Sequence, residues 1–215
     1  SKQSRGLGDV YKRQGKNTQG LSNYLKKLFN EEKLKVAIAF DCRHNSKSFA
    51  KIVANVFSAN DIEVFLFEDL RATPELSFTV KYLNCQCGIV LTASHNPPEY
   101  NGYKVYWKDG GQLVPPHDKA IIKIINNLDY TDINFEANET LIHMIGADVD
   151  NVFIDAAVEN GVINQNSLEN RDELTIVFTS LHGTSITAVP ETLRRAGYKN
   201  VHIVKEQALP NGDFT

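Results

Sequence analysis

The sequence predicts an α/β fold in which a mostly parallel, mixed sheet is sandwiched between helices. Three short apolar runs support this prediction: residues 35–40 (KVAIAF), 64–68 (VFLFE) and 87–91 (CGIVL). Segments with helical periodicity separate them, and strands that alternate with helices form parallel sheets covered on both faces. Polar residues follow the first and third runs directly, at the sheet edge where open α/β folds bind ligands.

Length and charge limit the possible classes of protein. A chain of 215 residues forms one large domain, or one domain and part of another. Because 23 basic and 26 acidic residues give a net charge of −3, we expect neither nucleic acid nor an anionic membrane as a partner. No apolar run reaches the roughly 18 residues of a membrane span, and no signal-peptide pattern is visible.

The three cysteines point to a cytoplasmic location. They are odd in number and lack the spacing of a metal site, so we interpret them as buried thiols in a reducing compartment. They are Cys42, Cys85 and Cys87.

Residues 1–14 are polar and basic and show no helical period, so we interpret them as a disordered or foreign segment. Helical spacing of apolar residues begins after Thr18 and predicts a helix that ends shortly before the strand at 35–40. Its apolar face is formed by Leu21, Tyr24, Leu25, Leu28 and Phe29.

The polar loop 41–48 (DCRHNSKS) follows the first strand. Arg43 is placed either to reach a neighbouring loop or to pair with Asp41, and the sequence leaves both roles open. Ser46 or Ser48 is expected to cap the next helix. The apolar face of that helix is formed by Phe49, Ile52, Val53, Val56 and Phe57.

The central part of the chain continues the strand–helix alternation. The strand at 64–68 precedes a helix with Thr73 as N-cap and Pro74 in its first turn, ending near Leu83. Residues 103–107 form a further strand, and Pro115–Asp118 opens an isoleucine-rich helix. His117 is expected in the first turn of that helix, without a role as a ligand.

The last third of the chain is predicted to be a connector followed by a second, incomplete α/β unit. Apolar spacing is irregular from 126 to 171, apart from a possible helix over 152–158, and we assign 146–172 as the connector. A strand at 173–180 is then followed by Leu181-His182-Gly183, where His182 is expected to order the loop. A helix near 189–197 and a strand at 201–204 complete the pattern.

The most informative stretch is TASHNPPEYNGYK, from Thr92 to Lys104. Two consecutive prolines exclude a helix there, so Ser94, His95 and Asn96 lie on a stiff loop after a buried strand. Lys104 returns on the following strand, which would place a basic group near a hydroxyl nucleophile. This pairing suits phosphoryl transfer. The alternative is an ordinary turn in which the hydroxyl is satisfied locally.

This stretch resembles the active-site serine loop of the α-D-phosphohexomutases, the family that contains phosphoglucomutase and phosphomannomutase. The Asp41-x-Arg43 and Leu-His-Gly patterns extend the resemblance, whereas Arg5-Gly6 is only a fragment of the family's upstream loop. The resemblance implies that 15–145 is phosphohexomutase domain 1 and 173–215 the start of a similar domain 2. The chain would then be an N-terminal fragment, with the missing C-terminal domains as its partners. The strings FEDLRATPELSF and NGYKVYW favour the bacterial phosphoglucomutase type.

The resemblance implies an enzyme that interconverts hexose 1-phosphate and hexose 6-phosphate, glucose being the favoured sugar. Ser94 would be carried as a phosphoserine, with hexose 1,6-bisphosphate as intermediate and activator. Lys104 and His95 are the acid–base candidates, and His95 alternatively bonds the phosphate. Arg43 and Asn96 would contact substrate, Asn96 also holding the loop's shape. Mg²⁺ is the expected cofactor and would bind Ser94 through its phosphate, since hard cations suit phosphate oxygens.

Two other functions compete with this interpretation. A non-catalytic sugar-phosphate-binding module would keep the loop without turnover. A serine hydrolase is the weaker alternative, because the sequence around Ser94 lacks a G-x-S-x-G elbow.

Overall fold

In the computed structural model, which describes residues 7–161 and 170–215, a five-stranded sheet has the order β4-β3-β1-β2-β5. Pairing is parallel except between β3 and β4, so the predicted mostly parallel, mixed sheet is confirmed. The strands are β1 (Lys35–Phe40), β2 (Glu63–Phe67), β3 (Cys87–Leu91), β4 (Tyr103–Trp107) and β5 (Ile142–Ile145).

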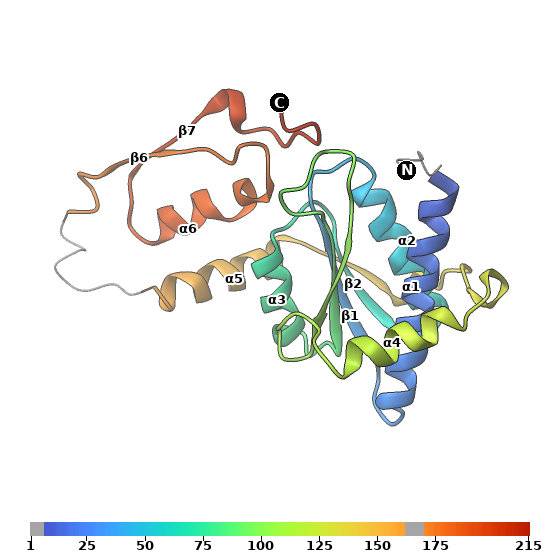
Figure 1. The fold of residues 1–215 in the computed structure, drawn as a ribbon. Helices are drawn as coiled ribbons and strands as arrows, with labels where there is room; N and C mark the ends of the chain where they lie inside the picture. The colour runs from blue at the N-terminus through green and yellow to red at the C-terminus, as the bar shows by residue number, and fades with distance from the viewer. Residues whose placement is uncertain (1–6, 162–169) are drawn as a thin grey trace.

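Helices cover both faces of this sheet (Figure 1). One face packs against α1 (Leu7–Leu28), α2 (Ser46–Ala59) and α4 (His117–Asn126). The other packs against α3 (Thr73–Tyr82) and α5 (Ala147–Glu159).

The sequence of β1 explains why the two faces differ. Side chains alternate along a strand, so Val36, Ile38 and Phe40 enter the larger core beside α1 and α2. Ala37 and Ala39 face α3 and α5 instead. On β3, a Cβ at Gly88 would lie 2.5 Å from the Val80 side chain of α3. Small residues on this face therefore let α3 pack close to the sheet.

A smaller unit follows α5 in the chain. It contains the parallel pair β6 (Thr175–Phe178) and β7 (Asn200–Ile203), with α6 (Val189–Arg195) between them in sequence. Figure 1 shows that the chain then returns, so that its C-terminal end lies above the large sheet. Short 3-10 helices occur at Tyr130–Asp132, Glu139–Leu141, Thr184–Thr187 and Lys205–Gln207.

The prediction of irregular structure for the N-terminal segment is wrong over residues 7–14, because α1 begins at Leu7. Polar side chains on α1 hid its helical character. Residues 11–13 are exposed, whereas further along the helix polar side chains are buried and bonded: Thr18 Oγ1 donates to the Gln14 carbonyl, and Gln19 exchanges two 2.9 Å hydrogen bonds with Asn60. Arg5 and Gly6 lie outside the described residues. That the segment is foreign stays a prediction, as do the domain boundaries.

Three smaller expectations are also corrected. Neither Ser46 nor Ser48 caps α2, since the N-cap residue is Asn45 (φ 64°) and Ser46 is the first helical residue. Likewise Ala72, not Thr73, is the N-cap of α3. The stretch 126–171 also contains β5, and the helix predicted over 152–158 is present as the longer α5. Residues 162–169 of the predicted connector lie outside the described residues.

The environment of two thiols agrees with the expectation of buried cysteines. Cys85 and Cys87 are buried, and burial raises the pKa of Cys85 to about 12. Cys42 is only half-buried. Over residues 7–161 and 170–215, no helix is both long and apolar enough to cross a membrane.

Candidate active site at the Ser94 loop

The candidate site lies where β1 and β3, two neighbouring parallel strands, end at the same edge of the sheet. Loop 41–45 follows β1, and loop 92–102 follows β3 and carries Ser94. The two loops meet through backbone as well as side chains, since Asp41 N donates to the Leu91 carbonyl over 3.1 Å. This is the strand edge at which α/β sheets place ligands.

The Asp41 carboxylate ties the two loops together. Its Oδ1 accepts hydrogen bonds from Ser46 Oγ (2.8 Å) and from the Arg43 backbone N–H (3.0 Å). Its Oδ2 accepts a 2.6 Å bond from Thr92 Oγ1, which in turn accepts from the Ser94 backbone N–H at 3.0 Å. Asp41 thus sets the position of the Ser94 backbone through a single intermediate side chain.

Arg43 holds the serine loop directly. Its side chain is almost fully buried, and its Nη2 donates to the carbonyls of Ser94 (2.8 Å) and Asn96 (2.7 Å). Its Nη1 donates to the carbonyls of Pro97 (2.8 Å) and Tyr100 (3.1 Å). Its Nε lies 3.2 Å from Asp41 Oδ2.

Both roles left open for Arg43 are therefore present: it reaches the serine loop and it pairs with Asp41. Its terminal N–H groups are all used on loop carbonyls. Arg43 also lines the cavity described below, and its contact with substrate stays a prediction.

Ser94 itself is exposed and has φ 56°, in the left-handed region that non-glycine residues rarely occupy. Such conformations persist where the surroundings hold them, and the bonds from Thr92 and Arg43 do so here. Ser94 Oγ lies 3.4 Å from His95 Nδ1, a long contact for this pair of atoms. The Ser94 backbone is therefore held in place, and its hydroxyl is open to a ligand.

A cavity of about 320 Å³ opens beside Ser94. Its wall includes Ser94, His95 and Asn96, the group predicted from the sequence. The Asn96 backbone is used in the loop, where its N–H donates to the Ala93 carbonyl. Its side-chain amide has no hydrogen-bond partner among the described residues, so it can bond a ligand. The remaining wall residues are Arg43, Pro97, Pro98, Asp213 and Phe214.

Lys104 is the predicted site residue that the structure does not bring to this cavity. It lies on β4 opposite Val90, on the face of the sheet that packs against α3. It is half-buried, and within the described parts of the chain it makes no hydrogen bond or ion pair. Its charge is thus available, but not in contact with Ser94.

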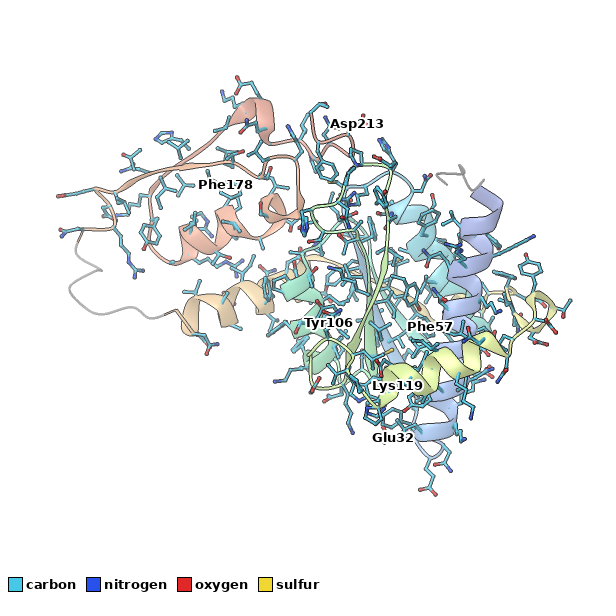
Figure 2. All side chains as sticks on the ribbon, in the orientation of Figure 1. Glu32, Phe57, Tyr106, Lys119, Phe178 and Asp213 are labelled. Carbon is cyan, nitrogen blue, oxygen red and sulfur yellow. The ribbon has the colours of Figure 1, made fainter. Side chains whose placement is uncertain are left out.

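Asp213 and Phe214 are the site residues that the sequence did not indicate. Asp213 Oδ1 lies 2.6 Å from His44 Nε2, and the Phe214 ring covers the Arg43 guanidinium at 4.9 Å. Figure 2 shows Asp213 above the sheet, beside the loops that follow the strands. The contact joins residues 169 positions apart, and no local pattern near 211–214 pointed to it.

The described residues do not by themselves fit a magnesium site. They contain no group of three His, Cys, Asp or Glu side chains placed to hold a metal ion. Around Ser94, the Asp41 carboxylate is occupied by three donors and Asp213 is paired with His44. Mg²⁺ normally takes one or two carboxylates with water and phosphate oxygens. The two carboxylates described near Ser94 are already engaged by other partners.

Comparison with known proteins gives a consistent picture. Residues 14–132 match the family described as phosphoglucomutase/phosphomannomutase, alpha/beta/alpha domain I, and residues 151–215 match its domain II. The phosphoglucomutase of Staphylococcus haemolyticus is 36% identical over 197 residues, which cover 91% of this chain and 35% of that protein. The phosphoglucomutase of Staphylococcus epidermidis is 38% identical over 186 residues, covering 84% and 33%.

Solved structures show the same fold. A putative phosphomannomutase from Thermus thermophilus superposes with a TM-score of 0.73 at 23% identity, over 94% of this chain and 43% of that one. Parafusin, a phosphoglucomutase from Paramecium, gives 0.68 at 18% identity, covering 94% and 41%. The chain spans about a third of the length of the curated relatives it matches. It belongs to the phosphoglucomutase/phosphomannomutase family.

Proposed function

We propose that this chain carries the nucleophile of a phosphosugar mutase that interconverts hexose 1-phosphate and hexose 6-phosphate. The observation that carries the proposal is the exposed Ser94 side chain at the edge of a cavity, on a backbone held by Thr92 and Arg43. Phosphoryl transfer needs positioning and neutralisation of charge more than covalent chemistry. A hydroxyl on a preorganised loop meets the first need.

The reaction proceeds in two transfers. Phosphorylated Ser94 gives its phosphoryl group to the free hydroxyl of a hexose monophosphate: the P–O bond to Ser94 breaks, a P–O bond to the sugar forms, and the sugar hydroxyl loses its proton to a base. The hexose 1,6-bisphosphate turns over in the site. In the second transfer the P–O bond between the sugar and its other phosphoryl group breaks, a P–O bond to the Ser94 oxygen forms and restores the phosphoserine, and the base returns its proton to the sugar oxygen that leaves.

The other residues have supporting roles. Asn96 offers a free amide to the sugar or the phosphate. Lys104 or His95 accepts the proton; Lys104 reaches the site only if the bound substrate extends towards β4, because it does not line the cavity. Mg²⁺, when bound, would neutralise phosphate charge and take an oxygen of phosphorylated Ser94. The rest of its ligands are proposed to come from parts of the protein outside this chain.

Glucose is the proposed sugar, because the curated relatives compared above are named phosphoglucomutases. The competing binding module predicts that Ser94 stays unmodified. We expect a full-length protein that contains this chain, incubated with labelled glucose 1,6-bisphosphate, to carry label on Ser94 alone. The matched control is Ser180→Ala, which keeps the label. Label retained in Ser94→Ala, or found at another residue, would remove the proposal.

A further inference from the structure

Two segments far apart in sequence meet beside the serine loop: residues 42–44, after β1, and residues 211–214, after β7. They approach backbone to backbone. A Cβ at Gly212 would lie 2.9 Å from the Cys42 carbonyl oxygen and 3.2 Å from the His44 nitrogen. Gly212 is therefore the residue that permits this close packing.

The residues on either side of Gly212 add side-chain contacts. Cys42 Sγ donates to the His182 carbonyl (3.0 Å) and lies 3.7 Å from the Asn211 carbonyl. Asp213 Oδ1 pairs with His44 Nε2 at 2.6 Å. Segment 211–214 thus contacts both Cys42 and His44.

Phe214 makes the contact that matters most for Ser94. Its ring lies over the Arg43 guanidinium, with 4.9 Å between the ring centroid and Cζ. Its φ is 56°, an unfavourable conformation for an aromatic residue, held by a 3.2 Å bond from its N–H to the Asn211 carbonyl. A strained backbone that places a ring on one guanidinium face indicates that this placement is specific.

Arg43 passes this contact on to the serine loop. Its terminal nitrogens hold the carbonyls of Ser94, Asn96, Pro97 and Tyr100. A guanidinium free to tilt into solvent would lose these bonds together, because the group is a rigid fork. The ring of Phe214 covers one face of this guanidinium, and the Arg43 side chain is only 1% exposed.

We propose that segment 211–214 of the second unit is a positioning clamp, in which Phe214 fixes Arg43 and Arg43 fixes the loop that carries Ser94. The clamp deepens the proposed function, since it acts on the proposed nucleophile. Its residues are positioning residues: they act on Ser94 through Arg43. The order of the serine loop then depends on where the second unit sits.

Amide hydrogen exchange of the 215-residue chain tests the clamp without any activity. The reporters are the amides of Asn96 and Tyr100, which donate inside the serine loop. We expect Phe214→Ala to speed their exchange by about 2- to 30-fold, the range that corresponds to one lost cation–π contact. Amides of β1 and β3 should not change. Phe214→Tyr, which keeps a ring face, should restore the slow exchange.

Leu209→Ala is the matched control, because Leu209 belongs to the same terminal stretch but is 79% exposed. It should leave the loop amides unchanged. If Phe214→Ala also leaves them unchanged, or if Phe214→Tyr fails to restore them, the clamp does not exist.

If Phe214→Ala speeds amide exchange throughout the chain, a second variant separates a local effect from a global one. Gly212→Ala displaces segment 211–214 but keeps the Phe214 ring. The clamp predicts faster exchange in the serine loop alone. Faster exchange throughout the sheet in both variants would make the segment a general stability element and overturn the proposal. The labelling of Ser94 is independent of this result, so the failure of the clamp and that of the proposed function are distinguishable.

Discussion

At the scale of single residues, the candidate site is supported by two side chains with little exposure, those of Arg43 and Asp41. Asp41 and Arg43 together bond Thr92, Ser46 and the carbonyls of the serine loop. The exposed residues Ser94, His95 and Asn96 are left free for chemistry. Rigid support beneath an exposed nucleophile is what in-line phosphoryl transfer requires, since small errors in position are costly.

Replacing Asp41 by Asn tests this support. The amide keeps one acceptor oxygen but puts an N–H₂ group against donors, so at least one buried donor loses its partner. We expect the free energy of unfolding to fall by about 1–3 kcal/mol, measured by urea denaturation. Asp61→Asn is the control, because its side chain is 87% exposed, and it should change stability by less than about 0.5 kcal/mol. Equal effects of the two variants would show that Asp41 is not the tie between the loops.

Lys104 provides the second test at this scale. In a full-length protein that contains this chain, we expect Lys104→Ala to lower kcat by about 10²–10⁴-fold, as for a positioned acid–base group, with the fold unchanged. Lys119→Ala, an exposed lysine on α4 at a distance from the Ser94 loop (Figure 2), is the control. A decrease below about tenfold for Lys104→Ala would assign the residue to the structure of β4 and leave His95 as the base.

The sequence predicted only part of this site, for physical reasons. Ser94, His95 and Asn96 share one loop, so chain connectivity alone brings them together. Arg43 was expected nearby because parallel neighbouring strands end at the same edge of a sheet. The sequence did not show whether Arg43 bonds the neighbouring loop or Asp41. Phe214 could not be predicted from the sequence, since its contact with Arg43 depends on how a second unit packs.

At the scale of elements, local pattern decided which segments could be foreseen. β1 and β3 fall on the predicted residues because both are continuous apolar runs buried on two faces. β5 was missed: it is a short edge strand whose His143 and Met144 are exposed, so it has no apolar run. The first turns of α1 were missed because residues 7–14 are mostly polar and residues 11–13 are exposed, so no apolar face marks the start of the helix.

The packing of α3 against α5 rests on a charged group that the sequence did not reveal. Arg71 donates to both Asp150 oxygens, at 2.7 and 2.8 Å, and lies 3.9 Å from Glu75 Oε1. Glu75 is fully buried. Burial, followed by a hydrogen bond to Asp150 and the charge of that residue, raises the pKa of Glu75 to about 8, although Arg71 opposes the shift. Glu75 is therefore protonated at neutral pH.

This arrangement predicts a loss of stability at alkaline pH. Between pH 4.5, the ordinary pKa of the carboxyl, and about 8, the folded chain binds more protons at Glu75 than the unfolded chain. The free energy of unfolding therefore falls as the pH rises through this window. We expect Glu75→Gln to flatten this pH dependence, measured as the urea midpoint across the window. Glu139→Gln, an exposed control, should keep it. A slope unchanged in Glu75→Gln would contradict a protonated Glu75.

At the scale of the whole molecule, the chain consists of a large sheet that carries the Ser94 loop and a second, smaller unit. In this second unit, Val177 on β6 is 70% exposed and Leu181, in the loop after β6, is 60% exposed. The large sheet, by contrast, has a closed core on both faces. The serine loop thus lies on the large sheet, whose core is closed, whereas the proposed clamp belongs to the second unit, whose apolar side chains are more exposed.

This division predicts that the 215-residue chain alone lacks mutase activity at any Mg²⁺ concentration. A phosphoserine adds nearly two negative charges, and the described residues offer no cluster of carboxylates to hold the cation that would neutralise them. Even the acidic pair on α5 is committed, since Asp150 bonds Arg71 and Asp148 accepts from the Gly146 N–H. The cavity wall beside Ser94 also contains no lysine, and its single arginine is used on the loop. Nothing there grips a second phosphate, so the orientation that contributes several kcal/mol to such transfers is absent.

The measurement is a coupled assay of glucose 6-phosphate formed from glucose 1-phosphate, with a trace of glucose 1,6-bisphosphate and increasing Mg²⁺. We expect no turnover above the Ser94→Ala background. A full-length relative assayed in parallel confirms that the coupling system responds. Turnover at about 1 s⁻¹ or faster, within the ordinary enzymatic range, would contradict the prediction. It would mean that side chains interpreted here as structural, Asp41 and Asp213 before others, leave their present partners to hold the metal and the distal phosphate.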